Sequence, residues 1–272
     1  MTRPAIDAIA DRLIAAYDGA TTLASFGARE PGFDVAAAYD VLAEIERRRR
    51  AQGWKAAGRK IGFTNRTIWA RYGVYQPMWA HVWTHTVRLV AAGSATLSLA
   101  RLVQPRIEPE VVFKLNAPVP ATDDADAILG CIEWIAPGFE IVQSHFPDWK
   151  FTAADCTAAF GLHGALVVGA PVAITAQNRA AIAAGLPTFT LQLRHGGTLI
   201  DTGTGANVLG SPAFALAHLA RVLATQPWAP PLAAGEVVTT GTVTDAWPVA
   251  SGETWASDYG TLGLSGLTVT FT

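Results

Sequence analysis

The sequence has too little of several features to belong to some specialised classes of protein. Its 272 residues include only two cysteines, Cys131 and Cys156. Two isolated thiols make neither a disulfide framework nor a zinc ligand set, and they fit a reducing compartment. No stretch approaches the roughly 18 uncharged apolar residues of a membrane span, and the N-terminus lacks the apolar run of a signal peptide. We therefore expect a cytoplasmic protein without a membrane partner.

Charge is also scarce. Charged residues make up 15% of the chain and the formal net charge is −2. Proteins that bind nucleic acid normally carry a basic excess, so we expect no nucleic-acid partner. Hydrophobic residues make up 50% of the chain, which is enough for a sizeable core in one domain, or in one domain with an appendage.

The chain divides by texture into two parts. Residues 1–59 are expected to form a helical N-terminal region, because Ile6, Ile9 and Leu13 recur on one helical face and Asp34 precedes a second helical pattern as an N-cap. Residues 60–272 are expected to form a β-rich domain, since short β-rich runs separated by Gly and Pro follow one another. These expected strands cover residues 84–91, 110–115, 139–142, 165–168, 188–193, 237–240 and 267–271.

Two helices are expected among these strands. One spans residues 123–134 after Thr122 as the capping residue, and the other runs from Ser211 to Leu223 with Pro212 in its first turn. Few crossover helices between many strands favour an α+β fold with a mostly antiparallel or mixed sheet over a doubly wound one.

The most informative stretch reads RIEPEVVF at residues 106–113. Glu108 and Glu110 are two residues apart, so both side chains point to one face of an extended segment. Two adjacent carboxylates at an apolar strand repel each other and lose solvation, which a divalent cation with oxygen ligands can compensate. Glu140 is a third acid flanked by apolar residues. The alternative is that Glu108 and Glu110 pair with Arg106 and Lys114 on an exposed edge.

Several motifs in order resemble one known family. The motifs are GRKIGFT at residues 58–64, YGV at 72–74, PRIEPE at 105–110, EIV at 140–142, DWKF at 148–151 and GANVLGSP at 205–212. Together they resemble the 2-keto-4-pentenoate hydratase and 4-oxalocrotonate decarboxylase group of the fumarylacetoacetate hydrolase superfamily. The resemblance extends over nearly the whole chain, to the final strand.

The resemblance implies that residues 60–272 form the catalytic domain, with a mixed β-roll or sandwich core, and that residues 1–59 form a helical N-terminal region. It also implies one Mg²⁺ or Mn²⁺ ion held by Glu108, Glu110 and Glu140, and it places Lys60 at the family's active-site lysine. Members of the group act on small 2-oxo or 2-enol carboxylic acids and usually form homo-oligomers. We expect the same of this chain.

The chain also departs from the family pattern. Residues 143–145 read QSH where hydratases usually read DSR, and AAF at residues 158–160 replaces an Ala-Asp-Asn segment. His163 follows closely, which makes it a second candidate for acid–base catalysis after Lys60, although a core histidine bonded to backbone is equally consistent with the sequence. We expect proximity to a metal and to apolar walls to lower the pKa of Lys60.

Four residues are candidates for contact with the substrate. Trp79 can supply an aromatic wall, although aromatic residues more often belong to the core or to a subunit interface. His145 is a weaker histidine candidate. Gly241 and Thr242 lie in a turn that could donate backbone N–H groups to a substrate carboxylate, and a tight turn without a ligand explains the same residues.

The sequence therefore predicts a metal-dependent lyase. A hydratase that adds water to a 2-hydroxy-2,4-dienoate in the breakdown of aromatic or related compounds is the first hypothesis. A decarboxylase of a 4-oxalocrotonate-like acid is the second, followed by a C–C hydrolase or tautomerase of an acylpyruvate-like acid. A non-catalytic partner subunit is the alternative from another class, and the retained glutamates and Lys60 argue against it.

Overall fold

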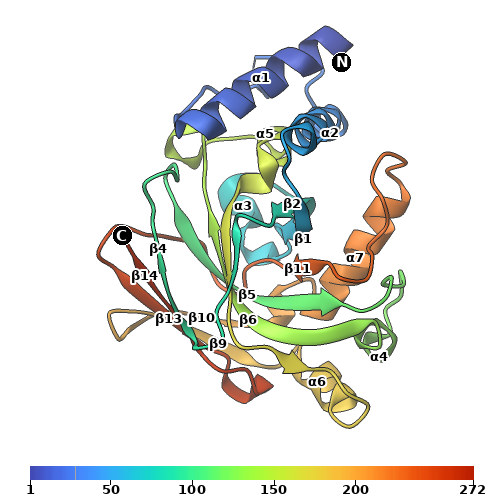
Figure 1. The fold of residues 1–272 in the computed structure, drawn as a ribbon, viewed down its shortest axis with the longest axis vertical. Coiled ribbons are helices and arrows are strands. Elements are labelled where there is room, and N and C mark those ends of the chain that lie inside the picture. The colour runs from blue at the N-terminus through green and yellow to red at the C-terminus, as the bar shows by residue number, and fades with distance from the viewer. Residues whose placement is uncertain (28) are drawn as a thin grey trace.

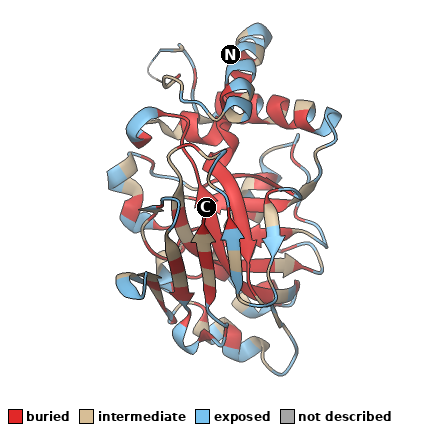
Figure 2. Ribbon diagram, turned by 60° about the vertical axis from the view of Figure 1, so that its left-hand side comes forward, coloured by how far each residue is buried: buried red, intermediate tan, exposed pale blue. Residues whose placement is uncertain are grey.

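The computed structural model describes residues 1–27 and 29–272. Two β-sheets occupy the centre of the molecule, and two long helices, α1 and α2, lie together at one end (Figure 1). The strand segments in the middle of the molecule are largely buried, whereas exposed residues gather on the outer helices and at the ends of the sheets (Figure 2). The site is built on the larger of the two sheets.

The large sheet has nine strands within the described residues, in the order β2-β1-β11-β5-β6-β7-β3, with β12 beside β5 and β8 beside β6. Most neighbours are antiparallel, but β1 and β11 run parallel, as do β3 and β7. The strands are Ala56–Gly62 (β1), Met78–Trp83 (β2), Val87–Leu89 (β3), Arg106–Leu115 (β5), Ile132–Val142 (β6), His163–Val168 (β7), Val172–Ala173 (β8), Val237–Thr239 (β11) and Trp247–Pro248 (β12).

The small sheet has five strands within the same part of the chain, in the order β10-β9-β13-β14-β4. Only the β14–β4 pair is parallel. The strands are Ser94–Leu97 (β4), Thr190–His195 (β9), Thr198–Thr204 (β10), Thr254–Asp258 (β13) and Leu267–Phe271 (β14). A mixed large sheet beside a second sheet, with helices at the N-terminus, confirms the predicted α+β fold.

Two N-terminal helices cover one end of the large sheet. They are α1 (Arg3–Gly19) and α2 (Val35–Ala51), and the side chain of Asp34 accepts a hydrogen bond of 2.9 Å from the backbone N of Ala37. The predicted N-cap is therefore confirmed. The apolar faces of both helices share one buried cluster with residues of the β domain, namely Phe146, Ala154, Ala158, Ala159 and Phe160. This cluster joins the helical region to the segment that enters β7.

The remaining α-helices are shorter. They are Trp69–Tyr72 (α3), Ala125–Leu129 (α4), Ala153–Ala158 (α5), Arg179–Gly185 (α6) and Pro212–Ala224 (α7). The predicted helix after Ser211 is confirmed as α7, where the Ser211 side chain accepts from the backbone N of Ala213. Short 3-10 turns precede α3 and follow α5, at Arg66–Ile68 and Phe160–Leu162.

The helix predicted over residues 123–134 is wrong in its second half. Helix α4 ends at Leu129, and strand β6 begins at Ile132 and pairs with β5. Asp124 caps the helix in place of Thr122, since its carboxylate accepts from two backbone N–H groups. A short apolar run next to a helix cannot be told from a buried strand by periodicity alone, and here the pairing with β5 decides it.

Other predicted boundaries also differ from the structure: β5 and β6 begin earlier than predicted, at Arg106 and Ile132. A turn separates β2 from β3 where one strand over residues 84–91 was expected, and a backbone hydrogen bond of 2.9 Å from Thr86 N to the Trp83 carbonyl closes it. Strand β1 begins at Ala56, so the division predicted between residues 59 and 60 falls within a strand. The separation into a helical region and a catalytic domain otherwise stays a prediction.

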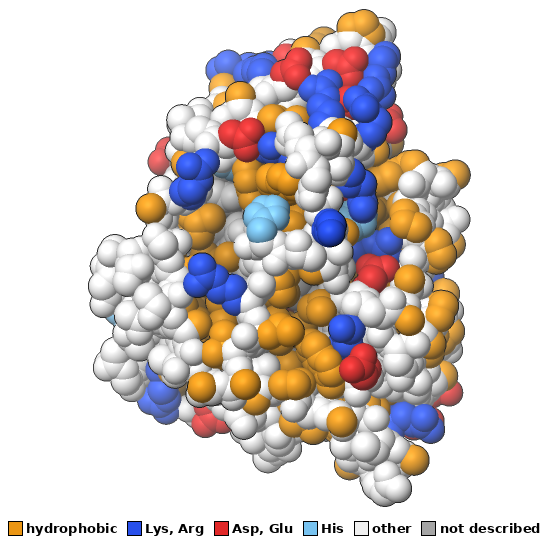
Figure 3. Space-filling model, viewed as in Figure 1, with side chains coloured by type: hydrophobic (Ala, Val, Ile, Leu, Met, Phe, Trp, Pro, Cys, Tyr) orange, Lys and Arg blue, Asp and Glu red, His pale blue; other side chains and the backbone are white. Residues whose placement is uncertain are grey.

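The surface repeats the scarcity of charge seen in the sequence. On the face shown in Figure 3, charged side chains crowd near the end where α1 and α2 lie, and apolar side chains extend across the middle. Among the described residues, no helix combines the length and apolar character needed to cross a membrane.

Tyr259 ties the end of β13 to the strands that carry the site. Its buried hydroxyl accepts from the Gly138 backbone N at 3.1 Å and donates to the Glu110 carbonyl at 2.7 Å. Tyr259→Phe leaves these buried groups without the hydroxyl, so we expect the free energy of unfolding to fall by about 1–3 kcal/mol in urea denaturation. Tyr75→Phe, at a side chain that is 64% exposed, is the matched control and should change little. Equal stability of both variants would contradict this role.

Candidate metal centre

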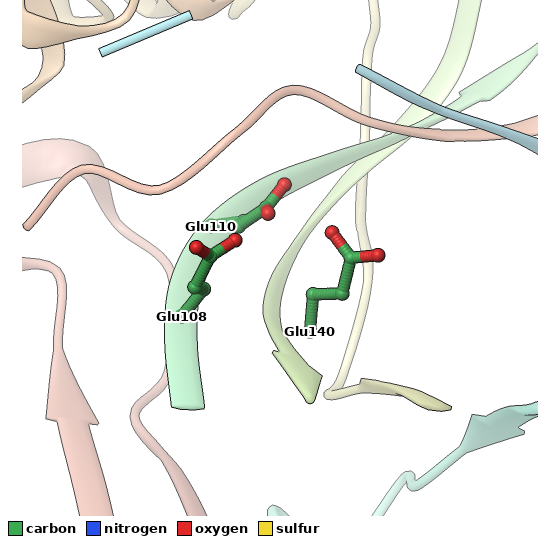
Figure 4. A group of neighbouring side chains, drawn as sticks. All are labelled: Glu108, Glu110 and Glu140. Atoms are coloured by element: carbon green, nitrogen blue, oxygen red, sulfur yellow. The ribbon is translucent and has the colours of Figure 1, made fainter. Parts of the chain in front are cut away.

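Three glutamates of the large sheet meet on one face. Glu108 and Glu110 lie two residues apart on β5, so the strand's alternation points both to the same side. Glu140 lies on β6 directly opposite Glu108 in the antiparallel register. One ligand oxygen from each of the three lies within 4.8 Å of the others. Figure 4 shows the three carboxylates converging from these two neighbouring strands.

Glu110 is held on one side only. Its Oε2 accepts a hydrogen bond of 2.6 Å from the Gly241 backbone N and a second, short bond from the Thr239 hydroxyl. Gly241 has a φ of +96°, and a side chain there would collide with Thr64, so the close approach needs glycine. Glu110 Oε1 is buried without a hydrogen-bond partner among the described residues. A buried carboxylate oxygen left free beside two other carboxylates fits a divalent-cation ligand.

Glu140 has a positive or polar group at each oxygen. His163 Nδ1 lies 2.8 Å from Oε1, and Lys60 Nζ lies 3.1 Å from Oε2. Burial pushes the pKa of Glu140 upward, but Lys60 and His163 outweigh it and lower the pKa to about 2. Glu140 is therefore ionised in the folded protein at neutral pH.

The other two glutamates have the opposite electrostatic balance. Burial raises the pKa of Glu108 to about 7 although Lys60 opposes the shift. Burial also raises the pKa of Glu110 well above its usual value, and the charges of Glu140 and Glu108 add to that rise. A single ammonium group thus does not balance three buried carboxylates, and a bound cation would.

Lys60 lies beside the glutamates, and the direction of its pKa shift is opposite to the one expected. It lies on β1 with a side chain that is 3% exposed, and it donates a 2.9 Å bond to the Gly161 carbonyl. Burial favours the neutral amine, but Glu140, Glu108 and Glu110 together outweigh it, so the pKa of Lys60 is raised. The prediction of a lowered pKa considered the apolar walls and missed the three carboxylates.

The Gly161 carbonyl reaches Lys60 from a strained turn. Phe160, Gly161 and Leu162 have consecutive positive φ values of 56°, 59° and 64°. Left-handed conformations cost non-glycine residues roughly 1–2 kcal/mol each, and such strain often marks functional sites. The turn begins at Phe160, within the segment that departs from the Ala-Asp-Asn pattern. The altered segment therefore leads directly into the carbonyl that accepts a hydrogen bond from Lys60.

A small cavity adjoins Lys60 and Glu108. Its wall is mainly apolar and aromatic, with Lys60 and Glu108 as its two charged residues. The lining consists of Lys60, Gly62, Phe63, Asn65, Ile68, Tyr72, Glu108, Val142, Trp149, Leu162, Thr242 and Ala246. Of the two turn residues predicted to contact the substrate, Thr242 lines this cavity, whereas the backbone N of Gly241 donates to Glu110 instead.

The structure does not bring three of the predicted residues to the cavity. Trp79 is fully buried and stacks on the rings of Tyr39 and Trp228, which makes it a core residue. His145 packs beside Tyr17 near the N-terminal helices, and its Nδ1 bonds the Thr21 carbonyl. His163 lies behind Glu140 and outside the cavity lining. The predictions of Trp79 and His145 as substrate contacts are therefore unsupported by the geometry.

Other residues at the site were not predicted. Tyr72 and Trp149 form part of the cavity wall, and both belong to motifs that carried the family resemblance without an assigned role. Thr239 is paired opposite Val112 on β5, and its hydroxyl reaches Glu110 across strands. Arg106 stands behind the wall, with a bond of 2.6 Å to the Tyr72 hydroxyl and its guanidinium 4.2 Å from the centre of the Trp149 ring. Strand alternation from Glu108 places Arg106 on this face.

Comparison with known proteins agrees with this geometry. Residues 72–269 match the family described as fumarylacetoacetate (FAA) hydrolase C-terminal. The chain belongs to the fumarylacetoacetate hydrolase family. Among its relatives is 2-hydroxyhexa-2,4-dienoate hydratase of Comamonas testosteroni, 32% identical over 91% of both chains. Another is 4-oxalocrotonate decarboxylase of Pseudomonas sp. strain CF600, 30% identical over 82% of this chain and 81% of that one.

A solved structure in the family supports the metal centre. The 4-oxalocrotonate decarboxylase from Pseudomonas putida G7, complexed with magnesium and adipate, superposes with a TM-score of 0.88. It is 26% identical, and the match covers 100% of this chain and 99% of that one. The predicted resemblance to hydratases and decarboxylases of this family is thus confirmed, and the relatives are lyases.

Metal-induced stabilisation should depend on pH. A carboxyl pKa raised in the folded state, as at Glu108, favours folding at low pH, and that contribution is lost as pH rises from about 4.5 through about 7. Protons also compete with the metal below that pKa, by up to about tenfold in affinity per pH unit for each proton displaced. We expect Mg²⁺ or Mn²⁺ to raise the Tm of EDTA-treated protein more at pH 8 than at pH 6.

Glu110→Gln is the control for this measurement. It removes a buried carboxylate whose Oε1 has no partner, so the variant should fold in EDTA but show almost no metal-induced rise in Tm. A wild-type rise that is larger at pH 6, or one that persists in Glu110→Gln, would contradict the assignment.

Gly161→Ala should disturb Lys60 more than it disturbs the fold. A Cβ at Gly161 would meet Lys60 Cδ at 3.1 Å and Ala80 Cβ at 3.0 Å. We expect turnover to fall by about tenfold or more because displacing a reacting group by a fraction of an ångström is costly. Gly196→Ala is the matched control, since Gly196 also has a left-handed φ (+54°) but nothing within 4 Å of an added Cβ. Its stability should fall by about 1 kcal/mol with turnover unchanged. Equal turnover in both variants would refute the positioning of Lys60.

Proposed function

We propose that the chain is a divalent-metal-dependent hydratase that adds water to a 2-hydroxy-2,4-dienoate with an apolar tail, in the breakdown of aromatic or related compounds. The observation that carries this proposal is the composition of the cavity beside the three glutamates. Apart from Lys60 and Glu108, the lining is uncharged and largely apolar or aromatic. Such a wall suits a hydrocarbon chain attached to one carboxylate and its neighbouring C2 oxygen.

Glu108, Glu110 and Glu140 would hold Mg²⁺ or Mn²⁺. When bound, such an ion supplies a Lewis acid that stabilises negative charge on the C2 oxygen of a 2-oxo acid. The buried donor set supports this role because all three ligands are carboxylates, which hard cations prefer. Thr239 and Gly241 keep Glu110 in place, and His163 does the same for Glu140.

Lys60 is the residue proposed to move protons. Its Nζ lies 3.1 Å from Glu140 Oε2 and its side chain lines the cavity, where an ammonium can donate a proton or stabilise an oxyanion. Proton transfer from the C2 hydroxyl to C5 turns the dienol into a 2-oxo-3-enoate. Hydroxide from water then bonds to C4, and the remaining proton bonds to C3, which gives a 4-hydroxy-2-oxo acid. The balance is one water added to the substrate, with no oxidation.

Arg106 favours a second candidate, the decarboxylase of a 4-oxalocrotonate-like acid. Such a substrate carries a second carboxylate, which needs a cation at the far end of the cavity. Arg106 contacts the cavity residues Tyr72 and Trp149, and no carboxylate of the described residues forms an ion pair with it. It is nevertheless behind the wall and outside the lining, which is why the hydratase is preferred.

Turnover of two substrates by wild type and Arg106→Gln separates the two candidates. The protein is assayed with Mg²⁺ or Mn²⁺ and with EDTA, on 2-hydroxypenta-2,4-dienoate and on a 2-oxo-enedioate, with products identified by mass. A hydratase gains one water on the monoacid, loses activity in EDTA and keeps its KM within about threefold in Arg106→Gln.

Release of CO₂ from the diacid, with kcat/KM reduced about tenfold or more in Arg106→Gln, would instead establish the decarboxylase. That reduction follows from losing a charge-assisted hydrogen bond of about 1.5–3 kcal/mol. Two fragments would indicate a C–C hydrolase, and an isomer of unchanged mass would indicate a tautomerase. Activity on neither acid despite metal binding would contradict both lyase proposals and leave the partner-subunit hypothesis.

A further inference from the structure

His163 contacts Glu140 on the side away from the cavity. It is the first residue of β7, and its Cα pairs with that of Val142 on β6. The side chain is 2% exposed, and its Nδ1 lies 2.8 Å from Glu140 Oε1. Because His163 is absent from the cavity lining, this ring contacts a carboxylate ligand and not a substrate.

The other ring nitrogen also has a defined partner. His163 Nε2 lies 2.8 Å from the hydroxyl oxygen of Thr86, which belongs to the turn between β2 and β3. The same hydroxyl lies 3.0 Å from the Trp83 carbonyl and accepts from the Trp83 backbone N at 3.2 Å. Thr86 itself is buried. A chain of hydrogen bonds therefore runs from the turn through His163 to Glu140.

The donor and acceptor roles in this chain follow from the chemistry of each group. An ionised carboxylate only accepts, so the nitrogen that faces Glu140 must carry a hydrogen. In a neutral imidazole the second nitrogen is then an acceptor, and the Thr86 hydroxyl can turn its hydrogen toward Nε2. The Trp83 N–H continues to hold the hydroxyl oxygen in place. The Trp83 carbonyl already accepts from the Thr86 backbone N at 2.9 Å, so the hydroxyl hydrogen is free to face Nε2, and that arrangement favours the tautomer that donates to Glu140.

We propose that Thr86 and His163 are positioning residues that fix Glu140 as a metal ligand, with Thr86 acting through the tautomer of His163. The inference rests on the metal-binding role proposed for Glu140. It gives His163 a role different from acid–base catalysis on the substrate. Partners that orient a ligand in this way typically change metal affinity by about 10–100-fold when removed.

Metal affinity of Thr86 variants tests this proposal. Thr86→Val keeps the shape but removes the hydroxyl, whereas Thr86→Ser keeps the hydroxyl. By isothermal titration of EDTA-treated protein with Mn²⁺, we expect Thr86→Val to bind about tenfold or more weakly than wild type, and Thr86→Ser to bind within about threefold of it. Thr157→Val is the matched control, because it removes a buried hydroxyl that bonds Ala153 O and Met78 Sδ.

Nuclear magnetic resonance of the wild-type protein gives a second readout that no variant's folding can obscure. In ¹⁵N-histidine-labelled protein loaded with Mg²⁺, His163 should carry its hydrogen on Nδ1 and show a bare Nε2, and His163→Asn identifies its signal. A bare Nδ1 would overturn the proposal, as would equal Mn²⁺ affinity in wild type and Thr86→Val. If the wild-type protein binds neither ion, the metal-binding role proposed for Glu140 is wrong. If the wild type binds Mn²⁺ and Thr86→Val binds it equally well, only the positioning role is wrong.

Discussion

The mutual repulsion of three neighbouring carboxylates is the constraint on which the rest of the site depends. Glu110 and Glu140 are buried, Glu108 is half-buried, and the three bring their ligand oxygens within 4.8 Å of one another. Burial alone would favour their protonated forms, and each charge makes the next more costly. Lys60 compensates part of this charge, and a divalent cation can compensate the remainder.

The three glutamates do not share this burden equally. Glu140 is already ionised by Lys60 and His163, Glu110 is held by Thr239 and Gly241, and Glu108 lies at the cavity. The fold accepts local strain to make these contacts. The left-handed turn at residues 160–162 directs one carbonyl at Lys60 and then begins β7 with His163. One short segment thus supports both the proposed proton donor and one metal ligand.

The sequence predicted that Glu108 and Glu110 lie together because alternation along a strand is a local property. Glu108 and Glu110 share a face by spacing alone, while Glu140 and Lys60 needed the family resemblance, since pairing of β5 with β6 and of β1 with β11 is not local. His163 was found as a residue but not in its role, which depends on Thr86 from a turn that was predicted as a strand. Trp79 and His145 were misplaced because sequence neighbours of site motifs on a strand or turn can point into the core.

The pKa of Lys60 also depends on contacts between distant parts of the sequence. A metal and apolar walls were expected near it, but the direction of the pKa shift depends on three charges brought together by strands distant in the sequence. Helix α4 ended early for a related reason, since the apolar residues after it are needed to pair with β5. Local patterns therefore predicted secondary-structure elements and the types of candidate ligand. The direction of the Lys60 pKa shift and the contact of His163 with Thr86 could be known only from the tertiary structure.

The most direct test of the account is the anomalous scattering of crystals grown or soaked with Mn²⁺. We expect one strong peak per chain, within coordination distance of carboxylate oxygens from Glu108, Glu110 and Glu140 together. A crystal with no peak there, or with manganese bound only elsewhere, would contradict the central claim that these three residues form a divalent-metal site.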